Sequence, residues 1–87
     1  MITKSLSNEW ACNGIRVNAI APGYMATELT KTMRGMPGQV EDLTKRIPVG
    51  RWGDDKDLQG LAVFLASDAS EYVSGAVIPV DGGFMGR

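Results

Sequence analysis

The chain has 87 residues, of which 44% are hydrophobic and 22% are charged, as in an ordinary globular protein rather than a disordered tail. The formal net charge of -1 gives no reason to expect nucleic acid or an anionic membrane as a partner. Histidine is absent and Cys12 is the single cysteine, which excludes an internal disulfide, a cysteine- or histidine-based metal site and a Ser-His-Asp triad, and suits the cytoplasm. No apolar run reaches the ~18 residues of a membrane span.

Residues 2–13 are predicted to form an amphipathic helix, because Ile2, Leu6 and Trp10 recur at intervals of four. Gly14 follows, and a glycine in this position usually ends a helix in the left-handed conformation. No capping residue precedes the apolar stripe, so we expect this helix to be the remainder of a longer one.

A short apolar run over residues 15–21 is predicted to be a buried β-strand. Pro22 and Gly23 then end it, since proline provides no ladder donor and glycine permits close approaches that a Cβ would forbid. In open α/β sheets, ligands bind beyond the carboxyl ends of the strands. Tyr24 and Thr27 are therefore expected to lie where a small molecule would bind.

The long segment 28–46 is polar, and its apolar residues are only loosely spaced. We expect one short helix on either side of a break at Gly35-Met36-Pro37-Gly38. A segment of this length between two strong elements favours a lid or a binding loop, and a mobile surface loop without a ligand is the equally weighted alternative.

The second half of the chain is predicted to contain one helix and one strand. Asp54 or Asp55 is expected to cap a helix that ends near Ala66. The second half of this helix is apolar on every side, which predicts that a second subunit or further chain covers it. Residues 76–80 form the strand, where Pro79 favours the edge of a sheet. The order of elements favours two parallel strands joined by a crossover.

Two polar residues stand out from their surroundings. Asn18 lies within the first predicted strand, and its amide is expected to tie that strand to a neighbouring loop. Arg51 suits either an acidic group of a substrate or, more commonly, the turn formed by residues 48–50.

Five signatures in order along the chain resemble the C-terminal portion of a short-chain dehydrogenase/reductase. The resemblance covers essentially the whole chain and is most similar to the dehydrogenases that act on gluconate or 2-deoxygluconate, with the 3-oxoacyl carrier-protein reductases as the near rival. The signatures are Ser5-Leu6-Ser7-Asn8-Glu9-Trp10, Ile15-Arg16-Val17-Asn18-Ala19-Ile20-Ala21-Pro22-Gly23, Gly50-Arg51-Trp52-Gly53, Val63-Phe64-Leu65-Ala66-Ser67 and Val80-Asp81-Gly82-Gly83.

This resemblance implies an α/β fold, the C-terminal piece of a Rossmann-type doubly wound parallel sheet. Residues 1–87 would form one partial domain with the last two strands, their two main flanking helices and a helical lid loop, without the N-terminal nucleotide-binding half. The family's Pro-Gly-x-x-x-Thr motif is matched by Pro22, Gly23 and Thr27. With Tyr24 and Met25 between them, these residues are implied to contact the nicotinamide half of NAD or NADP. Helix capping is the alternative role for Thr27, and the two roles are compatible.

Two motifs of the family are absent from the chain. No glycine-rich fingerprint for pyrophosphate occurs, and neither tyrosine begins a Tyr-x-x-x-Lys, because Glu28 lies four residues after Tyr24 and Ala76 four after Tyr72. We therefore assign no catalytic residue and no metal ligand, and we expect the isolated chain to be inactive.

The function implied by the resemblance is that of a segment of an oxidoreductase. It would contribute the nicotinamide-side loop, the substrate lid and an oligomer surface to an enzyme acting on a sugar acid or a similar secondary alcohol or ketone. The expected homo-oligomer would form through the helix around Phe64 and the strand around Val77. The alternative is a catalytically inert chain that acts, if at all, by association with itself or with family subunits.

Overall fold

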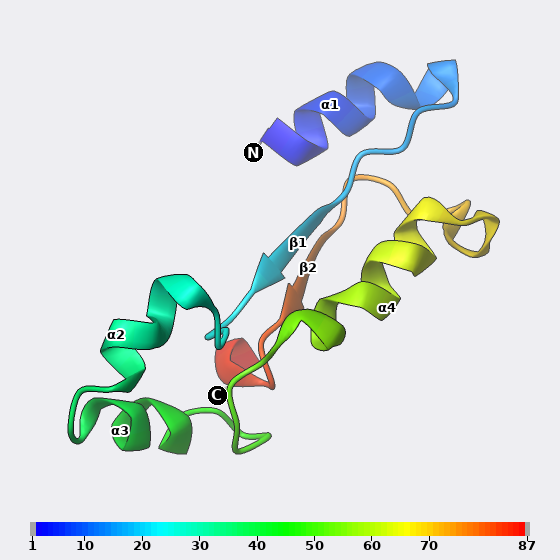
Figure 1. The fold of residues 1–87 in the computed structure, drawn as a ribbon. Coiled ribbons are helices and arrows are strands. Elements are labelled where there is room, and N and C mark those ends of the chain that lie inside the picture. Colours follow the sequence, from blue (N-terminus) through cyan, green and yellow to red (C-terminus); the bar gives the residue numbers. More distant parts are fainter. Residues whose placement is uncertain (1, 87) are drawn as a thin grey trace.

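The computed structural model describes residues 2–86. Figure 1 shows α4 running alongside a small sheet, α2 and α3 gathered beyond the carboxyl ends of its strands, and α1 at the opposite end. The elements, in chain order, are α1 (Ile2–Trp10), η1 (Ala11–Asn13), β1 (Ala19–Pro22), η2 (Glu28–Thr30), α2 (Lys31–Arg34), α3 (Gln39–Lys45), α4 (Asp55–Ala66), η3 (Asp68–Ser70), β2 (Val77–Val80) and η4 (Phe84–Gly86).

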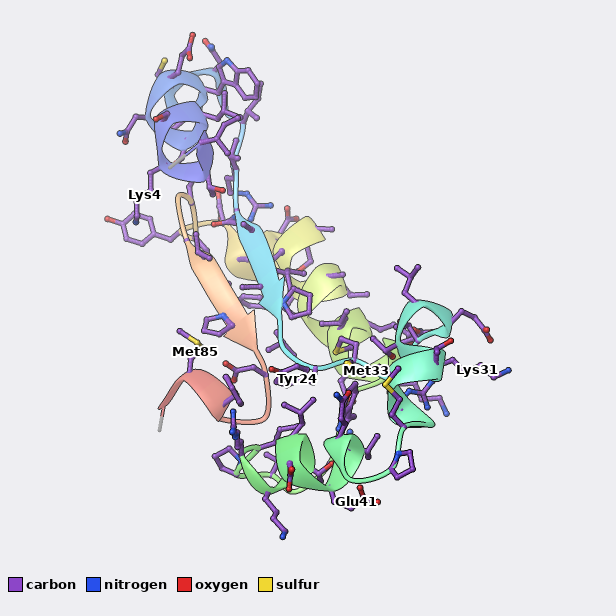
Figure 2. All side chains as sticks on the ribbon, turned by 90° about the vertical axis from the view of Figure 1, so that its left-hand side faces the viewer. Lys4, Tyr24, Lys31, Met33, Glu41 and Met85 are labelled. Carbon is purple, nitrogen blue, oxygen red and sulfur yellow. The ribbon has the colours of Figure 1, made fainter. Side chains whose placement is uncertain are left out.

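The predicted α/β arrangement with two parallel strands is confirmed. β1 pairs with β2 in a register that places Ala19 opposite Val77 and Pro22 opposite Val80. Figure 2 looks onto the face of the sheet that is turned away from α4, and no described helix covers that face. A parallel sheet normally has helices on both faces, so this one presents a side on which nothing in the described chain packs.

The first strand begins later and ends later than predicted. Residues 15–18 are not part of it, and Pro22 is its last residue rather than the residue that stops it. The reason lies in Asn18, whose Nδ2 donates to the Val73 carbonyl at 3.0 Å and whose Oδ1 accepts from the Ala76 N–H at 3.1 Å. The side-chain amide takes the place of backbone ladder bonds here, so regular pairing starts at Ala19. The predicted tie between Asn18 and a neighbouring loop is confirmed.

Helix α1 is confirmed, with a final 3₁₀ turn, and Gly14 ends it with a φ of 78°. The predicted apolar stripe, however, does not face the rest of the described chain, and Ile2 is 75% exposed. The buried positions are Thr3 and Ser7, and the Ser7 hydroxyl lies 2.6 Å from that of Ser74. Small polar side chains allow α1 to approach the loop before β2 closely, which the hydrophobic pattern did not predict.

The remaining elements follow the predictions closely. Two short helical segments flank the break at residues 35–38, and α4 begins after Asp54, which caps it. The Asp54 carboxylate accepts from the Lys56 N–H at 3.0 Å, and the Asp57 carboxylate accepts from the Asp54 N–H at 2.8 Å. Pro79 lies within β2, opposite Ala21 of β1. Every helix within residues 2–86 is too short or too polar to cross a lipid bilayer.

The fold is open and buries little apolar surface. Its accessible surface is 6283 Å², whereas a monomer of this mass would expose about 5,000 Å². The radius of gyration is 15.8 Å, against about 12 Å for a compact chain of this length. Ile47 is the buried hydrophobic residue of the described chain, at 4% exposure, while Val63 and Phe64 on α4 are 68% and 40% exposed. The expected uncovered face of α4 is therefore present.

Candidate functional site

The loop of residues 23–27 leaves the sheet at the carboxyl end of β1. The Gly23 N–H donates to the Val80 carbonyl at 3.0 Å, which continues the ladder by one bond beyond the strand. A Cβ built on Gly23 would stand 2.6 Å from the Asp81 Cβ and 2.8 Å from its Cα. Glycine is therefore required here by the close approach of the chain after β2, as the sequence predicted.

The same loop is joined to the segment that leads into α4. Met25 and Gly53 form a single parallel bridge, in which the Gly53 N–H donates to the Tyr24 carbonyl at 2.9 Å and the Ala26 N–H donates to the Gly53 carbonyl at 2.8 Å. This isolated bridge lies beyond the end of β1 and outside the two-stranded sheet. The loop is thus positioned by the start of α4 as well as by β1.

Tyr24 lies at the foot of β1, between the sheet and the helices α2 and α3 (Figure 2). Its ring centroid is 5.3 Å from that of Trp52 and 5.3 Å from that of Phe84, and the second pair meets edge to face. Trp52 in turn donates through Nε1 to the Thr44 hydroxyl on α3 at 3.1 Å. Aromatic packing and the Trp52 hydrogen bond therefore connect the loop to α3 and to η4.

A hollow of about 210 Å³ opens between this loop, the start of α4 and the end of β2. It is smaller than the roughly 300–1,000 Å³ of pockets that bury a drug-sized ligand, so it is too small to enclose such a ligand by itself. Its lining residues are Tyr24, Met25, Val49, Arg51, Gly53, Asp57, Val80, Asp81 and Gly82.

The charged part of the hollow is a bidentate ion pair. Arg51 donates from Nη1 and Nη2 to the two oxygens of Asp57 at 2.8 and 2.9 Å, and from Nη1 to the Trp52 carbonyl at 3.0 Å. The expectation that Arg51 holds the turn of residues 48–50 is wrong. The Asp57 carboxylate lies within hydrogen-bonding distance, and it is a stronger acceptor for a guanidinium than a backbone carbonyl. The hydrogen bonds from Arg51 and from the Asp54 N–H hold the pKa of Asp57 well below its usual range, and Asp57 raises the pKa of Arg51.

The five residues implied by the family motif lie on one continuous segment, but they face different surroundings. Tyr24 and Met25 line the hollow, whereas Pro22 and Gly23 belong to the end of the ladder. Thr27 occupies the N-cap position of η2, which confirms the capping role that the sequence allowed. Within residues 2–86, the backbone N–H groups of Tyr24 and Met25 donate no hydrogen bond.

Several residues that shape the site were missed by the sequence reasoning. Gly53, Asp57 and Asp81 line the hollow, and none of them is among the predicted site residues. Arg51 and Asp57 lie on either side of the capping residue Asp54, and Asp57 is at the acidic position of a capping box. This spacing was the signal that could have identified the pair. No group of three or more potential metal ligands occurs in the part of the chain that the structure describes.

Comparisons with known proteins agree with this architecture. A family model described as enoyl-(acyl carrier protein) reductase matches residues 1–85. The 2-dehydro-3-deoxy-D-gluconate 5-dehydrogenase of Bacillus subtilis is 57% identical over 86 residues, which are 99% of this chain and 34% of that protein. The gluconate 5-dehydrogenase of Gluconobacter oxydans is 45% identical over 82 residues, which are 94% of this chain and 32% of that protein.

A solved structure shows the same arrangement in a longer enzyme. The gluconate 5-dehydrogenase from Burkholderia cenocepacia, in complex with NADP and tartrate, is 44% identical and superposes with a TM-score of 0.95, over 100% of this chain and 34% of its own. The chain thus spans about a third of the length of the relatives it matches. With the family model matched over nearly every residue, the chain belongs to the short-chain dehydrogenase/reductase family, with the Rossmann-type fold of its structural neighbours.

Proposed function

We propose that this chain forms the nicotinamide-side part of an NAD(P)-dependent dehydrogenase that acts on a sugar acid or a similar secondary alcohol or ketone. The observation that carries the proposal is the loop from Pro22 to Thr27, which leaves β1 at its carboxyl end beside an open hollow. Ligands of open α/β sheets bind at such an edge. The two relatives named above act on 2-dehydro-3-deoxy-D-gluconate and on gluconate, and both are sugar acids.

The residues of the loop fit one half of such a cofactor. When bound, NAD or NADP exchanges hydride with the substrate carbon. The N–H groups of Tyr24 and Met25, which have no acceptor within residues 2–86, would bond the carboxamide oxygen, and the Thr27 hydroxyl would bond the carboxamide or a phosphate. Pro22 and Gly23 would form the wall against the nicotinamide ring. Either cofactor suits these groups equally.

The proton transfer that accompanies hydride movement has no agent in this chain. Tyr72 is fully exposed, and Tyr24 packs between two aromatic rings with Glu28, not lysine, four residues further on. Neither tyrosine has a lysine beside it to assist a proton transfer. The activity therefore requires groups that lie outside these 87 residues.

The proposal is tested in a chimera of the Bacillus subtilis relative in which this chain replaces the matching third. With 57% identity across the exchanged segment, we expect the chimera to fold and to oxidise or reduce the relative's substrate with NAD(H) or NADP(H). The chain purified alone is the control and should show no turnover. A folded chimera that binds neither cofactor would contradict the proposed function.

A second candidate function is association without catalysis, and the exposed face of α4 favours it. Val63 and Phe64 are 68% and 40% exposed in the second half of a helix, which is apolar from Leu61 to Ala66. We propose that this helix and the edge strand β2 form a contact between two copies of the chain. Sedimentation of the purified chain tests this, since a well-folded monomer at micromolar concentration would argue against it.

A further inference from the structure

We propose that Thr30 and Arg34 are positioning residues, which clamp the backbone of the loop and so set where Met25 and its neighbours meet the cofactor. This inference rests on the proposed function and assigns a role to two lid residues outside the family motif. It is carried by a cluster of hydrogen bonds that joins η2 and α2 to the loop.

The Thr30 hydroxyl is the centre of that cluster. Oγ1 accepts from the Thr27 N–H at 3.0 Å and from Arg34 Nε at 3.3 Å. Its proton can go to the Met25 carbonyl at 2.7 Å or to the Thr27 carbonyl at 3.1 Å, and the nearer Met25 carbonyl is the stronger acceptor contact. A hydroxyl has one proton to donate and two lone pairs to accept with, so all of its bonding capacity is used in this geometry. Thr30 is half-buried, which protects these bonds from exchange with water.

Arg34 completes the clamp from the end of α2. Besides its bond to Thr30, it donates from Nη2 to the Thr27 carbonyl at 3.0 Å. Both bonds carry the charge of the guanidinium, which makes them stronger than neutral ones. The side chain makes no ion pair with any carboxylate in residues 2–86, so its bonds to the loop are not weakened by a competing partner.

The consequence for the loop follows from the peptide planes. The peptide between Met25 and Ala26 is held at both ends, because its carbonyl accepts from Thr30 and its N–H donates to Gly53. The preceding peptide is held through the Tyr24 carbonyl, also by Gly53. The Met25 N–H, which belongs to that preceding peptide, is therefore left free and fixed in direction. Loss of the Thr30 hydroxyl releases one side of this arrangement.

Thr30→Val tests the clamp, because valine keeps the shape of threonine and removes the hydroxyl. Thr30→Ser keeps the hydroxyl and should behave as the original. Thr32→Val is the matched control, since Thr32 lies on the exposed side of α2 in the same lid. These variants and Arg34→Met are made in the chimera. Amide hydrogen exchange at Thr27 is measured, together with the affinity for NADP, or for NAD where the chimera binds NAD instead, and kcat and the KM of the sugar acid where turnover is present.

We expect Thr30→Val to speed exchange of the Thr27 amide and to weaken NADP binding about fivefold, the effect of one hydrogen bond, with a smaller change in the KM of the sugar acid. Arg34→Met should change both quantities in the same direction. Results for Thr30→Val equal to those for Thr32→Val would overturn the clamp. Faster exchange with unchanged NADP affinity would overturn its positioning role. A parent chimera that binds neither NAD nor NADP contradicts the proposed function instead, and the exchange data still decide whether the clamp exists.

Discussion

The sulfur atom of Met25 packs against Gly53, and a Cβ built on this glycine would lie only 2.8 Å from that sulfur. The contact occurs at the bridge that joins the loop of residues 23–27 to the segment before α4. Because the obstructing atom belongs to a flexible side chain, Gly53→Ala should be tolerated by a rotamer change of Met25. We expect a loss of less than about 1.5 kcal/mol in the unfolding free energy of the chimera, measured by denaturant titration.

Gly23 is a stricter case, although it also lies at a close approach. A Cβ there would lie 2.8 Å from the backbone Cα of Asp81, and a backbone atom cannot be moved away by a rotamer change as a side-chain atom can. Gly23→Ala should therefore destabilise the chimera by about 1–3 kcal/mol and displace the loop. Gly60→Ala is the control, since no atom lies within 4 Å of its Cβ and the residue is inside α4. That variant should gain up to about 1 kcal/mol, and equal effects of the two changes would contradict the steric argument.

Asn18 replaces two backbone ladder bonds, and its removal should open the start of the sheet. Asn18→Leu leaves the Val73 carbonyl and the Ala76 N–H without their partner. We expect a loss of about 1–3 kcal/mol in unfolding free energy and faster hydrogen exchange at Ala76. Asn8, exposed on α1, provides the comparison, and Asn8→Leu should leave both quantities unchanged. Slow exchange at Ala76 in the Asn18 variant would refute the assignment.

Local chemistry in the sequence was enough to predict most elements and the turn chemistry. Gly14 ends α1, Asp54 caps α4, and the break at residues 35–38 separates two short helices, each for the reason the residue types suggested. These features depend on residues only a few positions apart, so the residue types in the sequence are enough to predict them. The parallel pairing followed from the order of the elements alone.

Features that depend on distant residues were not predictable in the same way. The face of α1 that contacts the rest of the described chain did not follow from the stripe through Ile2, because that contact is made with Ser74 and Gly75, far along the chain. The bond of Arg51 to Asp57 competes with the nearby turn, and residue types alone do not rank the two. The hollow likewise forms only when the ends of both strands and the start of α4 meet.

The ion pair of Arg51 and Asp57 should make the start of α4 sensitive to acid. The pKa of Asp57 is depressed in the folded protein, chiefly by its hydrogen bonds to Arg51 and the Asp54 N–H. The contribution of the ionised Asp57 to stability is therefore fully present above the ordinary aspartate pKa of about 4. It is lost as the pH falls from there towards the depressed value. The raised pKa of Arg51 has no effect in this range, since arginine stays charged.

We therefore expect the first turn of α4 to be equally stable between pH 5 and 8, and to fray below about pH 4. The measurement is the titration of the Asp57 carboxyl carbon by NMR in the chimera, together with amide exchange at Lys56. Arg51→Gln should move the titration midpoint of Asp57 upward, towards the ordinary value, and Lys56→Gln should leave it unchanged. An ordinary Asp57 midpoint in the unsubstituted protein would show that the bidentate pair does not persist in solution.

The last prediction concerns the exposed face of α4, and it tests whether this face forms the proposed contact between copies. Val63 is 68% exposed, so a lysine at this position keeps the fold of the chain while it places a charge on the proposed contact between copies. Val63→Lys should lower the sedimentation coefficient of the chimera towards that of its monomer, because a charge buried without a partner in an apolar interface costs several kcal/mol. Thr32→Lys, with the same charge on the exposed side of α2, should leave the assembly intact. If both variants sediment as the parent does, α4 does not form the contact, and the exposed apolar face of this helix must be covered by another part of the enzyme.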